Sequence, residues 1–134
     1  MEKTPEAFGD FGRQVLDLLH TATDGVLALP ATNQPNERDL PGLLGEVRRA
    51  ARAVGQCVTT MGAKTLLHGD AEGGLAICWL KTALSPEQQM DAMHLAFDRT
   101  CAADSSSPGA AFSAYLVAMC EVFADPPRPP AGMS

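Results

Sequence analysis

The amino-acid sequence predicts an all-α protein, a compact bundle of about five helices around an apolar C-terminal helix. Helix-start signals occur three times, at Thr4-Pro5-Glu6, Ser85-Pro86-Glu87-Gln88 and Ser107-Pro108. In each, a hydroxyl can accept a hydrogen bond from an unpaired N–H of the first turn, and proline supplies a backbone φ that already suits a helix. Apolar residues also recur at helical spacing in several segments, which is typical of helices packed on a shared core.

The first helix is predicted from Pro5 to about Asp24. Successive helical residues turn by about 100°, which places six apolar side chains on one face. The segment from Pro30 to Asp39 is polar, contains two prolines and has no periodicity, so we expect a loop there. The apolar face of the first helix consists of Phe8, Phe11, Val15, Leu18, Leu19 and Ala22.

The second helix is predicted from Asp39 or Leu40 to His68, and it has the most regular apolar face in the chain. Glycines at 45, 55 and 62 weaken its continuity, because each costs about 1 kcal/mol relative to alanine in a helix. The sequence therefore predicts a helical segment with two alternatives, one continuous helix or two helices separated by a break near Gly62. Its apolar face consists of Leu40, Leu43, Leu44, Val47, Ala51, Val54, Val58 and Met61.

The third segment, 71–84, follows Asp70, which can cap a helix. Its centre, 75–80, is apolar on every side, and periodicity cannot distinguish a buried helix from a buried strand in such a run. A helix is the preferred interpretation, since a strand would stand almost alone in a helical chain. The alternative is an α+β fold with a short strand at 75–80.

The last two helices are predicted at 86–103 and 108–124. Gln88 can reach back to Ser85 and complete a capping box at the start of the first of them. The second has Ser113 and Glu121 as its only polar side chains after the cap, so it must be covered on all sides. It is therefore either the central helix of the bundle or half of an oligomer interface. We expect one helical domain at 1–125 and a disordered proline-rich tail at 126–134.

The charge and the cysteine content of the chain restrict the classes of function that it can have. The chain has 134 residues, with 16 acidic and 10 basic side chains and a formal charge of −6. This charge repels phosphates and anionic lipids, so we expect neither direct nucleic-acid binding nor membrane binding. The sequence has no secretory signal, and its four widely spaced cysteines are typical of free thiols in a reducing compartment, which predicts a cytoplasmic protein.

Two similar patterns could hold a metal ion, Asp17-x-x-His20-x-x-x-Asp24 and Asp91-x-x-His94-x-x-x-Asp98. Spacings of three and four bring each trio to one side of a helix, as in metal-binding bundles. The first trio, however, lies opposite the apolar face of its helix, whereas a core metal site needs inward ligands. Solvated acidic faces are therefore preferred, and a metal site is kept as an alternative.

The one basic cluster is Arg48, Arg49 and Arg52, which could contact a phosphate or carboxylate. Its simpler interpretation is a solvated helix face in an acidic chain. No phosphate-binding loop, nucleophile elbow or activated cysteine is present in the sequence, so we expect no cofactor and binding rather than catalysis.

The sequence is thus predicted to encode a non-enzymatic protein-binding or assembly module, of the adaptor, chaperone, immunity or inhibitor type common among small bacterial helical proteins. A homodimer formed through apolar helical surface is expected. One alternative is a small metal- or cofactor-binding protein that uses the Asp/His positions, and another is an acidic phosphate mimic that inhibits a nucleic-acid-binding protein. The predicted interface residues are Trp79, Phe112, Tyr115, Leu116, Met119 and Phe123.

Overall fold

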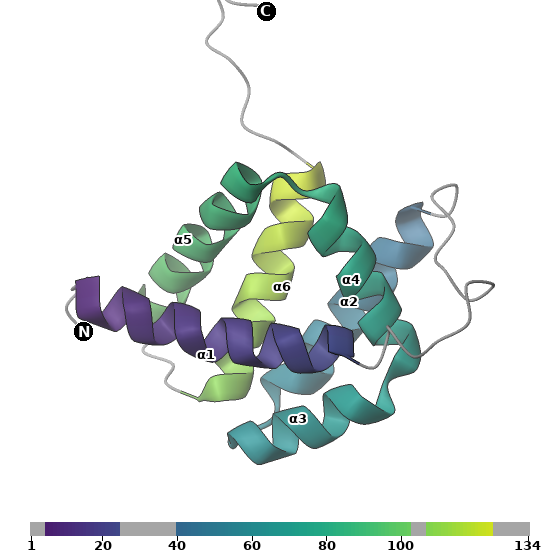
Figure 1. The fold of residues 1–134 in the computed structure, drawn as a ribbon, viewed down its shortest axis with the longest axis horizontal. Coiled ribbons are helices and arrows are strands. Elements are labelled where there is room, and N and C mark those ends of the chain that lie inside the picture. The colour runs from purple at the N-terminus through teal and green to yellow at the C-terminus, as the bar shows by residue number, and fades with distance from the viewer. Residues whose placement is uncertain (1–4, 25–39, 103–106, 125–134) are drawn as a thin grey trace, which may run out of the picture.

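The computed structural model describes residues 5–24, 40–102 and 107–124, and these ranges contain six helices and no strand. The all-α prediction is therefore confirmed, and the segment 75–80 is helical. The predicted tail at 126–134 and the predicted loop at 30–39 lie outside the described residues. In chain order the helices are α1 (Pro5–Asp24), α2 (Leu40–Gly55), α3 (Thr60–Gly69), α4 (Ala71–Ala83), α5 (Pro86–Ala102) and α6 (Pro108–Ala124) (Figure 1).

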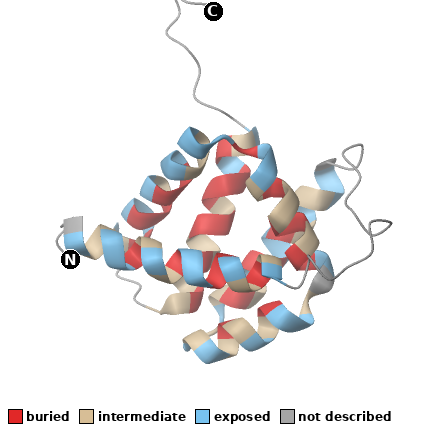
Figure 2. Ribbon diagram, in the orientation of Figure 1, coloured by how far each residue is buried: buried red, intermediate tan, exposed pale blue. Residues whose placement is uncertain are grey.

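Helix α6 is the centre of the bundle, as the sequence predicts. It contacts all five of the other described helices, with its largest contacts on α5 and α2. Figure 1 shows α6 between these two helices, with α1 crossing in front. Buried residues concentrate on α6 and on the sides of its neighbours that face it (Figure 2). A helix that is apolar on nearly every side is thereby covered over most of its surface by the five other described helices.

Side-chain caps begin the helices where the sequence predicts them. Ser85 and Gln88 form the expected capping box: the N–H of Gln88 donates to Ser85 Oγ at 3.1 Å, and the N–H of Ser85 donates to Gln88 Oε1 at 2.9 Å. At the start of α6, the N–H of Ala110 donates to Ser107 Oγ at 3.1 Å. These caps satisfy N–H groups that have no partner inside their helix. Thr4, in the first of the three signals, lies outside the described residues.

Of the two alternatives for the segment 40–68, the broken one is present: α2 ends at Gly55 and α3 begins at Thr60. The break precedes Gly62: Thr59 is extended, and its hydroxyl accepts a hydrogen bond from the N–H of Gly62 at 3.0 Å, which starts a new helix. As a result Val58 and Met61, which a continuous helix would turn inward, are 77% and 73% exposed.

Gly109 explains how closely α6 crosses the end of α2. A Cβ atom at this position would overlap the carbonyl oxygens of Val54 and Cys57. These oxygens belong to the backbone and cannot move aside as the end of a side chain can. The first turn of α6 therefore reaches the end of α2 only because residue 109 is glycine.

Gly109→Ala is accordingly expected to destabilise the protein by about 1 to 3 kcal/mol, the usual cost of inserting a methyl group into a packed contact. Gly45→Ala is the matched control: it lies within α2 with open space around it, so its methyl group should be neutral or stabilising by up to about 1 kcal/mol. Urea unfolding followed by circular dichroism compares the two variants. Equal stabilities would show that the crossing is not limited by this glycine.

Candidate functional site

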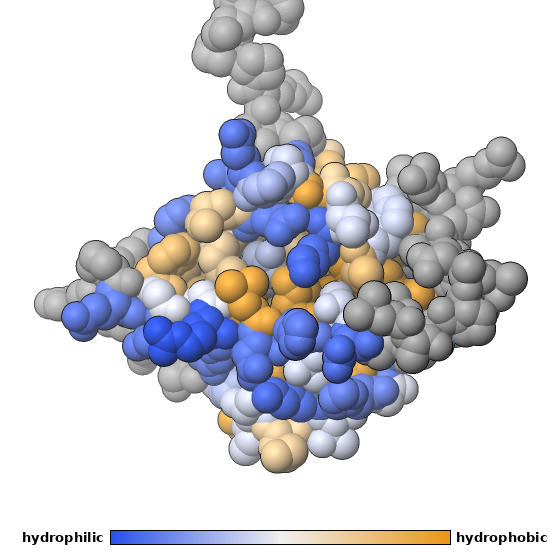
Figure 3. All heavy atoms as spheres, viewed as in Figure 1, coloured by the Kyte–Doolittle hydropathy of each residue, from blue (hydrophilic) through white to orange (hydrophobic). Residues whose placement is uncertain are grey.

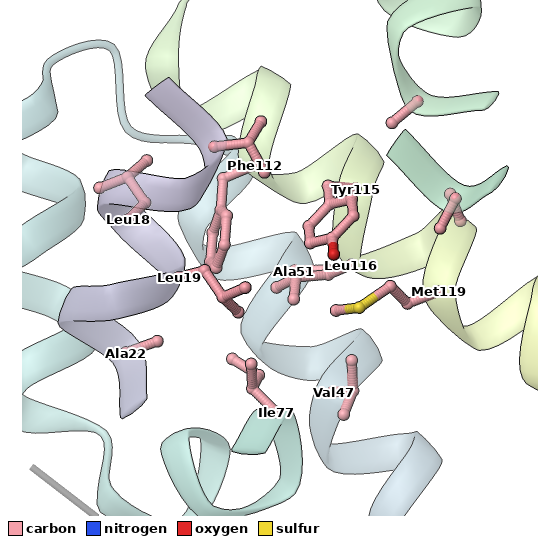
Figure 4. Packing of buried hydrophobic residues seen from close by; sticks show 14 of the residues in the cluster. Leu18, Leu19, Ala22, Val47, Ala51, Ile77, Phe112, Tyr115, Leu116 and Met119 are labelled. Atoms are coloured by element: carbon pink, nitrogen blue, oxygen red, sulfur yellow. The ribbon is translucent and has the colours of Figure 1, made fainter. Parts of the chain in front are cut away.

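The inner face of α6 forms the interior of the single chain. Phe112, Tyr115, Leu116 and Met119 are each at most 1% exposed. Figure 4 shows these side chains directed toward residues of α1, α2 and α4, among them Leu19, Ala51 and Ile77. Four of the six predicted interface residues are therefore buried in the core of the single chain. The cover of α6 comes mainly from α5 and α2, with smaller contacts from α1, α4 and α3.

Trp79 and Phe123, the remaining two predicted interface residues, are only partly buried. Their rings meet edge to face, with centroids 5.4 Å apart, and join α4 to the C-terminal end of α6. Such a pair contributes about 1 kcal/mol beyond the apolar area it buries. These two residues still reach the surface, but mainly they hold two helices of the same chain together.

The outward side of α6 is apolar and incompletely covered. Ala110, Ala114 and Val117 lie three or four residues apart, which places them on one side of the helix, and each is half-buried. Ser113 and Glu121, the polar side chains of α6, belong to the same side. Sequence analysis missed this surface, although the positions of those two polar residues indicate which side of α6 faces out.

Helix α2 borders this stripe along one edge. The Cα atom of Gly55 faces Ser113, where an added Cβ would lie 3.1 Å from the serine Oγ. Arg48 acts electrostatically on the thiol of Cys120: burial raises the pKa of Cys120 to about 11, and the positive charge of Arg48 opposes that rise. Arg52 follows Arg48 by one helical turn and so lies on the same side of α2. We call Arg48, Arg52, Ala110, Ser113, Ala114 and Val117 the α2–α6 surface.

The three arginines of the predicted basic cluster differ in their contacts. Arg49 turns away from the α2–α6 surface: its Nη2 donates to both carboxylate oxygens of Asp70, at 2.8 and 2.9 Å, and its Nε donates to Glu46 at 2.9 Å. Arg48 and Arg52 are exposed, and neither forms an ion pair with another described residue. Within the part of the chain that the structure describes, two carboxylates thus hold Arg49, whereas none holds Arg48 or Arg52.

Asp70 joins three helices at one carboxylate. It ends α3, caps α4 by accepting from the N–H of Gly73 at 2.9 Å, and holds α2 through Arg49. Burial raises the pKa of Asp70, but the hydrogen bonds from Arg49 and Gly73 outweigh that effect and leave the pKa below its usual range. The cap is visible in the sequence. The pairing with Arg49 is not, since 21 residues separate the partners.

The predicted Asp/His faces are engaged elsewhere in the fold. Asp17 pairs with Lys64 of α3 at 3.0 Å, and the ring of His94 stacks on Phe8 of α1, with centroids 4.5 Å apart. His20, Asp24, Asp91 and Asp98 are exposed on the outsides of α1 and α5. Within the described ranges, no group of three or more His, Cys, Asp or Glu side chains is placed to hold a metal ion.

The face of the molecule seen in Figure 3 carries both hydrophilic and apolar side chains. Hydrophilic side chains cover α1 and α3, and apolar atoms show between α1, α4 and α5. Leu16 of α1 and Met90 of α5 are each about half exposed, at 53% and 52%. Among the helices that the structure describes, none has the length and apolar character required to cross a bilayer.

Comparison of the chain with protein-family models, with curated proteins and with solved structures finds no match. The candidate site is therefore defined only by the exposure and the contacts of the described residues.

Proposed function

We propose that this protein is a cytoplasmic, non-enzymatic binding and assembly module that associates with a second protein molecule, in the first instance another copy of itself, through the α2–α6 surface. The observation that carries the proposal is the incomplete cover of α6. A stripe of apolar side chains lies part-exposed on the outside of the helix that otherwise forms the core. Burying the remaining apolar area against a partner is favourable by about 25 cal/mol per Å².

Two further features support this surface as a contact. The helix that carries most of this surface is held in place, because α6 is packed against every other described helix. It would not need to reorganise on binding. Val58 directly follows Cys57, whose carbonyl oxygen lies against Gly109 at the start of α6, and its side chain is largely exposed. A large apolar side chain thus stands beside one end of the stripe, where it can act as an anchor for a partner.

Light scattering at micromolar concentration tests the proposal. The wild-type protein is expected at twice the mass of the chain, and Ala114→Glu is expected at the mass of one chain, because a carboxylate would be forced into the contact. Leu16→Glu is the matched control, an equally charged change on the far side of the bundle, and it should remain dimeric. Circular dichroism verifies that both variants are folded. A wild-type monomer, or loss of the dimer in Leu16→Glu alone, would contradict the proposal.

A further inference from the structure

We infer that residues 56–59, which connect α2 to α3, form a hinge through which two copies of this chain exchange α1 and α2. In the exchanged dimer α2 and α3 join into one continuous helix, and α1 and α2 of each copy pack on α3, α4, α5 and α6 of the other. This inference goes beyond the proposed function and does not depend on the α2–α6 surface.

The buried faces of α2 and α3 would lie on opposite sides of a continuous helix. Val47 and Val54 mark the buried face of α2, and Ala63 and Leu67 mark that of α3. The step from Val54 to Ala63 amounts to about two and a half turns, at about 100° per residue. Both helices nevertheless pack on α4 and α6, which a single chain achieves by breaking the helix between them. Two copies that exchange α1 and α2 bury both faces without a break, one face in each half of the dimer.

The side chains at the hinge are apolar, and the single chain leaves them exposed. Val58 and Met61 are 77% and 73% exposed. In a continuous helix these two residues lie on the same side as Val54, because each follows the last at a helical spacing of three or four. In a two-fold dimer the two long helices pass each other at the hinges, and this side faces the other copy. The exchange therefore buries apolar side chains that a single chain leaves in water.

Two contacts hold the hinge in its broken form. The hydroxyl of Thr59 accepts a hydrogen bond from the N–H of Gly62 at 3.0 Å and so caps α3. Gly109 of α6 lies against the carbonyl oxygens of Val54 and Cys57. In a continuous helix these oxygens would instead accept from the N–H groups four residues later. The cap exists only in the broken form, so removing it shifts the balance toward the continuous helix.

Refolding from urea at high protein concentration, followed by size-exclusion chromatography with light scattering, tests the hinge. All variants carry Ala114→Glu, which removes the contact of the proposed function. Thr59→Ala should raise the ratio of dimer to monomer at least tenfold, because the loss of a cap counts about fivefold per chain and a dimer has two hinges. Thr65→Ala is the matched control: it removes an exposed threonine from within α3, where both forms are helical, and should leave the ratio unchanged.

Thr60→Pro, added to Thr59→Ala, should return the protein to a monomer. Proline suits the first position of α3, and the residue before it is already extended, with φ −124° and ψ 153°. A continuous helix cannot accommodate this proline, because its ring would meet the carbonyl group of Gln56 in the preceding turn. Circular dichroism verifies that the variant retains its helices.

The outcomes separate the hinge from the proposed function. Equal amounts of dimer in Thr59→Ala and Thr65→Ala would contradict the hinge, as would a dimer that persists when Thr60→Pro is added. A Thr59→Ala dimer that separates immediately on dilution would contradict it as well, since exchanged chains separate only by unfolding. The association through the α2–α6 surface is tested independently, by the masses of the wild type and of Ala114→Glu alone.

Discussion

Replacing Phe112 with alanine is expected to lower the free energy of unfolding by about 3 to 5 kcal/mol, the cost of emptying a large buried site that cannot fully collapse. Phe112 is completely buried. At this chain length the loss corresponds to a fall in the thermal midpoint of about 10 to 20 °C. Urea unfolding and thermal denaturation measure the two quantities.

Phe123→Ala is the matched control for this variant, since it removes the same side chain from the same helix. Phe123 is only partly buried at the end of α6, so its loss should cost no more than about half as much. The self-association of the folded fraction should be unchanged in Phe112→Ala, because the ring faces the interior. A variant with normal stability and lost self-association would place this face of α6 at an interface instead.

The protein is expected to lose stability steeply above pH 9. Burial raises the pKa of the Cys120 thiol from 9.0 to about 11, and it raises the pKa of the Tyr115 hydroxyl from 10.0 to about 12. In the unfolded chain each group releases its proton at the lower value. Between the unfolded and the folded pKa of each group, the unfolded state binds fewer protons than the folded state. The stability is therefore intact below pH 9 and falls as the pH rises toward 12. Because burial raises each of the two pKa values by two units, the free energy of unfolding falls by a total on the order of 5 kcal/mol.

Urea unfolding between pH 7 and about pH 11 tests this expectation. Tyr115→Phe and Cys120→Ala each remove one of the two ionisations, so each should flatten the fall in stability, whatever its effect at neutral pH. Cys78→Ala removes a partly buried thiol and is the control for cysteine loss in general. Identical slopes in every variant would show that these two groups are not the cause.

Local signals made much of this fold predictable from the sequence. The capping box at Ser85 and Gln88 and the serine cap at Ser107 depend on residues three apart, so the start of α5 and the start of α6 follow from the sequence alone. The segment 75–80 was harder, because a run that is apolar on all sides has no period. Burial between α2 and α6 favours the helix there.

The errors arose where distant residues determine local structure. Thr59 could have been recognised as a cap, but α2 ends where it does in contact with Gly109, more than fifty positions later in the sequence. That one break changes the number of helices and turns Val58 and Met61 outward. The arginine cluster divides for a similar reason: only the folded chain brings Asp70 to Arg49, which sets Arg49 apart from the exposed Arg48 and Arg52.

The position of α6 in both the chain and the core has a consequence for biosynthesis. It is the last of the six described helices along the chain, and it contacts all of the others. Until residues 108–124 have left the ribosome, α1, α2, α4 and α5 have no common surface on which to bury their apolar faces. The nascent chain therefore cannot complete this core segment by segment, and it exposes aggregation-prone apolar surface until α6 arrives.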